Sequence, residues 1–143
     1  MRLTGEHKQV LDEIWSEGIK SGWLNWNGVV TTRGWYVYSA KDGGRRLVTD
    51  ADGREYVLAD RSEPDWEAGA TFGTLYNQVC EAYDAPHIMI VYNNMTGRFD
   101  LELQGREVNQ QDWLTEPLVL GAMSPVHGLL LALRQAHEGD CDG

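Results

Sequence analysis

Residues 71–103 read TFGTLYNQVCEAYDAPHIMIVYNNMTGRFDLEL, and this stretch decides the fold class. Apolar residues in its first part recur at spacings of three and one, which predicts a helix over 71–83 with one apolar side. That side consists of Phe72, Leu75, Tyr76, Val79, Cys80 and Tyr83. Pro86 ends the helix, because proline lacks a backbone N–H and cannot continue it.

The second part of the stretch predicts a β-hairpin. Residues 87–92 are apolar on both faces, as in a central strand, and 93–97 form a loop that contains Gly97. In 98–103 the charged residues alternate with Phe99, Leu101 and Leu103, which is typical of a half-buried strand with a charged outer face.

Toward the N-terminus, between residues 23 and 59, the apolar period changes to two. Turn sequences recur here at Asn27-Gly28, 41–44 and 50–53. They separate predicted strands at 23–26, 29–32, 35–38, 46–49 and 55–58. Successive short strands joined by tight turns predict an antiparallel meander.

Helix-start signals occur at three places in the chain. Thr4 can cap a helix over 4–19, and Ser62 with Pro64 is a helix-start signal before the helix of 71–83. Ser124-Pro125 starts the last helix, 105–115 is assigned to an edge strand and a loop, and 138–143 is expected to be a frayed acidic tail. The sequence therefore predicts a single α+β domain over 1–143, a mainly antiparallel sheet (meander plus hairpin) packed with about three helices.

Composition excludes several function classes. The 143 residues include 12 Lys and Arg and 22 Asp and Glu, which gives a net charge of −10. That balance argues against direct nucleic-acid binding and against an anionic membrane surface. The chain has no apolar stretch of membrane-spanning length and only two cysteines, so we expect a cytoplasmic protein without a disulfide scaffold.

No motif of established chemistry is present. The turn 50–53 resembles the start of a calcium loop but has Val48 and Ala59 where ligands belong, and the histidines and cysteines lack metal-ligand spacing. We therefore predict no metal, no cofactor and no enzymatic activity. The enzyme alternative that stays open is a pocket lined by Cys80, His87 and Tyr92.

The negative charge is concentrated in two segments. Residues 42–67 hold 4 basic and 8 acidic residues, and 100–143 hold 2 and 8. If both segments lie on one flank, that flank attracts a basic partner, although the same charge equally serves solubility.

Six tryptophans are many for a chain of this length. They fill the core of a small domain, or some of them form a binding surface, because tryptophan concentrates interface energy. The binding interpretation expects Trp66 or Trp113 to be exposed beside acidic residues.

The succession of 74–83, 87–92 and 96–103 (helix, apolar strand, loop with Gly97, strand with one aromatic residue) resembles the core of the YezG-like immunity proteins, which neutralise bacterial polymorphic toxins. The resemblance covers about residues 4–104. It implies an α+β inhibitor that binds a toxin domain, often a nuclease, and it supplies no catalytic residues.

Our leading hypothesis is thus an immunity or antitoxin-type protein that occludes a basic toxin domain by charge complementarity. The predicted partner-binding residues are Asp50, Asp52, Asp65, Trp66, Asp100 and Glu102. A phage-type acidic inhibitor or DNA mimic is the alternative, although interleaved arginines (Arg45, Arg46, Arg54 and Arg61) argue against it. The small enzyme described above is the third hypothesis.

Overall fold

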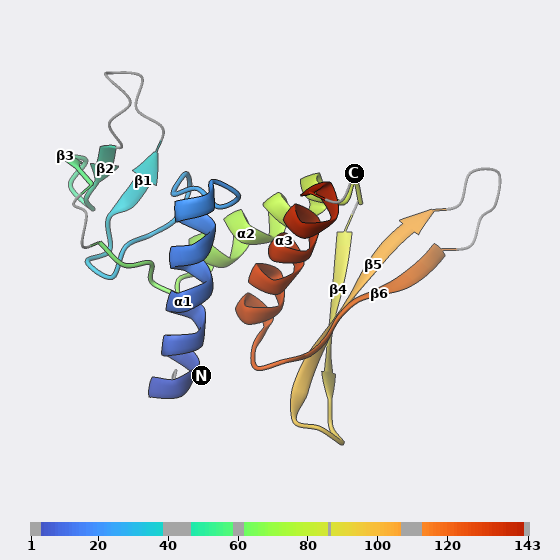
Figure 1. Cartoon of the computed structure of the whole chain (residues 1–143). Coiled ribbons are helices and arrows are strands. Elements are labelled where there is room, and N and C mark those ends of the chain that lie inside the picture. The colour runs from blue at the N-terminus through green and yellow to red at the C-terminus, as the bar shows by residue number, and fades with distance from the viewer. Residues whose placement is uncertain (1–3, 39–46, 59–61, 86, 107–112, 142–143) are drawn as a thin grey trace.

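The computed structural model describes residues 4–38, 47–58, 62–85, 87–106 and 113–141. These contain three helices and two three-stranded antiparallel sheets, which confirms the predicted α+β class. The helices are α1 (Gly5–Ser21), α2 (Gly69–Ala82) and α3 (Pro125–Cys141). The strands are β1 (Tyr36–Tyr38), β2 (Leu47–Thr49), β3 (Glu55–Val57), β4 (His87–Asn93), β5 (Arg98–Arg106) and β6 (Trp113–Ala122). The helices lie between the two sheets (Figure 1).

Helix α1 confirms the predicted helix over 4–19. Thr4 caps it, because its side chain accepts a hydrogen bond from the backbone N–H of His7 at 3.1 Å. Its apolar side is buried, and Leu11, Ile14 and Trp15 belong to the main core. The helix ends at Ser21, and Gly22 is its C-cap.

Strands β1, β2 and β3 form the predicted meander, with Val37 opposite Val48 and Val48 opposite Tyr56. The predicted strand over 23–26 is wrong, because these residues are irregular. Trp26 instead packs edge-on against Trp15 of α1, with ring centroids 5.0 Å apart, so packing against a helix overrides the strand pattern. The predicted turn over 41–44 lies outside the described residues.

The segment before α2 corrects a predicted helix start. Residues 62–65 are not helical, and α2 begins at Gly69 after Ala68, which provides no side-chain cap. The backbone groups of 62–65 pair with another segment: Thr32 N–H donates to the Glu63 carbonyl at 2.9 Å. Because this pairing holds residues 62–65 in an extended conformation, helix α2 begins only at residue 69.

Strands β4, β5 and β6 form the second sheet in that order. The predicted hairpin is present, but the prediction that 87–92 is central is wrong, since β4 lies at an edge and β5 is the central strand. The reason is that β6 pairs with the other side of β5, which places β5 in the centre. Strand β6 continues to Ala122, beyond the edge strand and loop predicted for 105–115.

Helices α2 and α3 cover the inner face of this sheet, where Leu101 of β5 and Leu129 of α3 are fully buried. Ser124 caps α3 as predicted, because its hydroxyl accepts from the His127 N–H at 3.2 Å. The helix continues to Cys141, so the frayed tail predicted from 138 is wrong up to that residue. No helix in the described part of the chain is long and apolar enough to cross a membrane.

Candidate functional site

Two of the predicted partner-binding residues, Asp50 and Asp52, lie in the turn between β2 and β3. Asp50 Oδ1 accepts from the backbone N–H groups of Asp52 and Arg54, each at 2.9 Å, and Oδ2 accepts from the Tyr56 hydroxyl at 3.2 Å. Asp52 is exposed. The Asp50 carboxylate is therefore occupied in forming the turn, a common role for aspartate.

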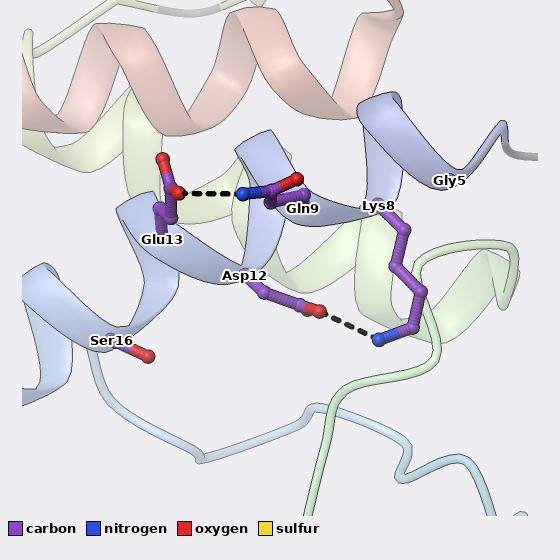
Figure 2. Close-up of a pocket in the computed structure, with 6 residues that line it drawn as sticks. All are labelled: Gly5, Lys8, Gln9, Asp12, Glu13 and Ser16. Atoms are coloured by element: carbon purple, nitrogen blue, oxygen red, sulfur yellow. Dashed lines mark hydrogen bonds and ion pairs between the residues drawn. The ribbon is translucent and has the colours of Figure 1, made fainter.

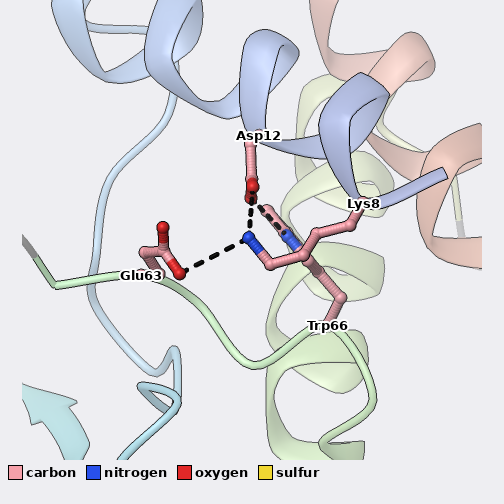
Figure 3. A network of polar contacts seen from close by, with 4 residues as sticks. All are labelled: Lys8, Asp12, Glu63 and Trp66. Carbon is pink, nitrogen blue, oxygen red and sulfur yellow. Dashed lines mark hydrogen bonds and ion pairs between the residues drawn. The ribbon is translucent and has the colours of Figure 1, made fainter. Parts of the chain in front are cut away.

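Asp65 and Trp66 lie between β3 and α2. Asp65 Oδ1 accepts from the Glu67 N–H at 3.0 Å. Trp66 is only 6% exposed, so the expectation that its ring is an exposed anchor is wrong. Its indole N–H donates to Asp12 Oδ1 at 3.0 Å (Figure 3), and its ring packs edge-on against Trp15. Because α1 supplies both contacts, Trp66 serves the core, as the alternative interpretation of the tryptophans expected.

The same figure shows how the charges around Trp66 are balanced. Lys8 Nζ lies 2.6 Å from Asp12 Oδ2 and 3.4 Å from Glu63 Oε2. The hydrogen bond to Asp12 is the main reason that the pKa of Lys8 is raised. Asp12 thus joins α1 to the segment before α2.

Asp100 and Glu102 lie on β5, on the side of the sheet that faces away from the helices. They alternate with Leu101, which points into the core. The turn 50–53 lies in the other sheet, on the opposite side of the helix layer (Figure 1). Asp50 and Asp52 therefore do not share a flank with Asp100 and Glu102, because the helices separate these two pairs of carboxylates.

Apolar side chains surround Asp100 and Glu102. In the strand pairing Val91 is opposite Asp100 and Met89 is opposite Glu102. On β6, Leu120 is 72% exposed beside a bulge, where Gly121 N–H donates to Asp100 Oδ1 at 2.9 Å. We call Met89, Val91, Asp100, Glu102 and Leu120 the outer sheet face.

A depression of about 490 Å³ lies along the outer side of α1 (Figure 2). Its polar side chains bind one another: Lys8 pairs with Asp12, and Gln9 Nε2 donates to Glu13 Oε1 at 3.3 Å. Since these groups are paired along one helix, the depression has the character of a solvated helix surface.

A second cavity, of about 540 Å³, lies where α1, the start of α2, the second sheet and the start of α3 meet; we call it the central cavity. It is lined by His7, Trp66, Glu67, Ala68, Gly69, Phe72, Ile90, Phe99, Ser124, Pro125 and Val126. Most of these residues are apolar, and His7 and Ser124 are each only 5% exposed.

His7 Nε2 lies 2.8 Å from Ser124 Oγ. Burial lowers the pKa of His7, and the pKa of His127 is lowered to about 4 by burial and by the nearby charges of His7, Arg134 and Arg98. Both imidazoles are therefore neutral at pH 7. His127 Nδ1 accepts from the Met123 N–H at 3.0 Å, so its proton lies on Nε2.

A serine and a neutral histidine at this distance resemble a nucleophile and its base, but two parts of an acyl-transfer site are missing from the described residues. No carboxylate bonds to His7, and the residue after Ser124 is Pro125, which has no N–H to donate to an oxyanion. The pair is thus a hydrogen-bonding group in the cavity wall.

The structure does not bring the three residues of the enzyme hypothesis into the central cavity. Cys80, His87 and Tyr92 do not line the central cavity, and His87 and Tyr92 stand near opposite ends of β4. Burial raises the pKa of the Cys80 thiol, which disfavours the nucleophilic thiolate. Within the described residues no cluster of three metal-ligating side chains occurs.

Sequence reasoning missed the pair of His7 and Ser124, because 117 positions separate these residues. The cap signal at Ser124 indicated a helix start but gave no sign of a partner in α1. No family model, curated protein or solved structure matches this chain.

Proposed function

We propose that this protein is a binding protein of the immunity or antitoxin type, which occludes a basic toxin domain with its outer sheet face. The observation that carries the proposal is the composition of that face: two carboxylates, on Asp100 and Glu102, flanked by the exposed apolar side chains of Val91 and Leu120. Such a protein would act in the cytoplasm of the cell that makes the toxin.

Apolar and acidic groups have separate tasks in such an interface. Val91 is 39% exposed and Leu120 72%, so both can bury further area against a partner. The carboxylates, within a chain of net charge −10, favour a cationic partner and accelerate its association.

The other groups of predicted residues support docking less well. Both carboxylate oxygens of Asp50 accept hydrogen bonds within its own turn, whereas Asp100 uses only Oδ1, in its bond to Gly121, among the described contacts. Trp66 is buried. The separation of the carboxylates between the two sheets also disfavours a DNA mimic, which needs them in continuous rows at phosphate spacing.

Co-expression tests the proposal. The first step is to establish whether a gene beside its own encodes a secreted protein with a C-terminal toxin module. That module is then produced together with this protein, and cell growth and the dissociation constant of the purified pair are measured. We expect the wild type to restore growth. Glu102→Lys should weaken binding by at least ~10-fold and reduce its salt dependence, and Leu120→Asp should weaken it similarly.

Glu17→Lys is the matched control, because it makes the same charge change at an exposed position of α1. It should leave affinity nearly unchanged. Equal losses from Glu17→Lys and Glu102→Lys would show that net charge acts without this face. Absence of any complex, or of protection, would refute the inhibitor function itself.

A further inference from the structure

We infer that the central cavity binds a small neutral molecule with an aromatic or aliphatic body and one carbonyl or hydroxyl oxygen. This inference does not depend on the proposed function. It rests on the shape and lining of the cavity and on the hydrogen bonds of His7 and Ser124.

The body of the ligand follows from the walls. Phe72 of α2, Ile90 of β4 and Phe99 of β5 line the cavity and are only partly buried by the rest of the chain. The volume of about 540 Å³ falls in the range of small-molecule sites, roughly 300–1,000 Å³. An apolar body of that size would remove these side chains from water.

The oxygen follows from counting polar hydrogens. Ser124 Oγ accepts from the His127 N–H at 3.2 Å and shares one hydrogen with His7 Nε2 at 2.8 Å. If the serine hydroxyl donates this hydrogen, the proton of neutral His7 lies on Nδ1. If His7 donates it, the hydroxyl hydrogen of Ser124 is left over.

In either arrangement one N–H or O–H hydrogen of the pair has no acceptor among the described residues. Both side chains are only 5% exposed, and no buried side-chain N or O atom of the described residues lacks a partner, so this hydrogen is a spare donor at the cavity wall. An oxygen atom of a bound molecule would accept this hydrogen.

The start of α2 adds donors on another wall. Ala68 and Gly69 line the cavity, and α2 has no side-chain cap for its first N–H groups. An anionic oxygen is disfavoured, because the lining residues include Glu67 and no Lys or Arg, and burial lowers the pKa of His7. A neutral carbonyl or hydroxyl oxygen fits these donors without repulsion.

Three probes with related bodies test the inference: 4-phenylbutan-2-one, butylbenzene and 4-phenylbutanoate, each titrated into the full chain and followed by its amide NMR signals. We expect the ketone to shift the signals of Gly69 and Val126 and to bind ~3–10-fold more tightly than the hydrocarbon, the gain from one hydrogen bond. The carboxylate should bind more weakly than the ketone.

Variants locate the binding. Ser124→Ala should abolish the preference for the ketone over the hydrocarbon, and Ser124→Thr, which keeps the hydroxyl and the helix cap, should retain it. Ala68→Phe, which adds bulk to the wall, should abolish binding of both probes. Ala70→Phe is the matched control, since Ala70 is exposed on α2 and does not line the cavity, and it should bind both normally.

The inference is overturned if no probe shifts these signals at millimolar concentration, or if Ala68→Phe binds as the wild type does. Equal affinity for ketone and hydrocarbon would refute the polar part of the site. Tighter binding of the carboxylate would refute its assignment to neutral ligands. None of these results bears on the outer sheet face, so failure here is distinguishable from failure of the proposed function.

Discussion

At the scale of single residues, most of the side chains predicted to bind another protein form hydrogen bonds within the chain. Asp50 holds its own turn, Asp100 accepts from Gly121 N–H, and the Trp66 indole donates to Asp12. A short carboxylate close to backbone N–H groups gains a hydrogen bond without ordering a long side chain. The aspartate carboxylates are therefore used in hydrogen bonds within the chain. Glu102 accepts no such hydrogen bond among the described contacts.

The buried histidine His127 predicts a stability loss in acid. Its folded-state pKa of about 4 lies below the ordinary value of 6.5, so below pH 6.5 the unfolded chain takes up the proton first. The free energy of unfolding should decrease as the pH is lowered from 6.5 to 4. Below pH 4, His127 should cause no further decrease. The loss should be at most about 3 kcal/mol.

Urea unfolding at pH 7 and pH 4.5 measures this loss. His127→Gln should unfold with a smaller difference between the two pH values than the wild type. An unchanged difference in His127→Gln would contradict the assignment.

At the scale of elements, two turns with similar backbones depend differently on their surroundings. Gly28 and Gly53 have φ of +87° and +84°, a region that side chains disfavour. A Cβ at Gly28 would lie 2.4 Å from Thr74 Oγ1, whose hydroxyl donates to the Gly28 carbonyl at 3.0 Å, while at Gly53 it would meet open space. The first turn is thus fixed against α2.

These contacts predict different costs for the same substitution. Gly53→Ala should lower the free energy of unfolding by about 1 kcal/mol, from backbone strain alone. Gly28→Ala should cost about 2–3 kcal/mol, because it also displaces the Thr74 side chain. Denaturant unfolding of the two variants checks this, and equal costs would mean that the contact with α2 contributes nothing.

At the scale of the whole molecule, stability is expected to be uneven. The main core joins all three helices to the sheet of β4, β5 and β6, with Leu101 and Leu129 fully buried in it. The sheet of β1, β2 and β3 buries Val37 and Val48, which lie outside that cluster. The sheet of β1, β2 and β3 is therefore stabilised by little buried apolar area.

Native-state hydrogen exchange should reveal two levels of opening. The amides of Val48 and Tyr56 should exchange through an opening that costs at least ~2 kcal/mol less than global unfolding, while Leu129 should exchange only with global unfolding. Val48→Ala should accelerate exchange in β2 and β3 alone, whereas Leu129→Ala should accelerate it everywhere. Equal protection in both sheets would contradict this division.

Much of the fold could be predicted because its signals are local. Apolar spacing predicted α1 and α2, and cap and turn residues such as Thr4, Ser124 and the 50–53 turn are where the sequence indicates. The failures occur where a distant partner decides. Residues 62–65 pair with residues 30–32 in place of starting a helix, and β4 lies at an edge because β6 occupies the other side of β5.

The sequence by itself determined the fold class, most element positions and the acidic net charge, since each depends on residue types and short spacings. Only the tertiary structure decided which side chains share a surface. It buried Trp66, placed Asp50 and Asp100 in separate sheets, and brought His7 to Ser124 across 117 positions. The physical reason is that long-range neighbours follow from how the helices pack against the two sheets, and no local pattern in the chain encodes that arrangement.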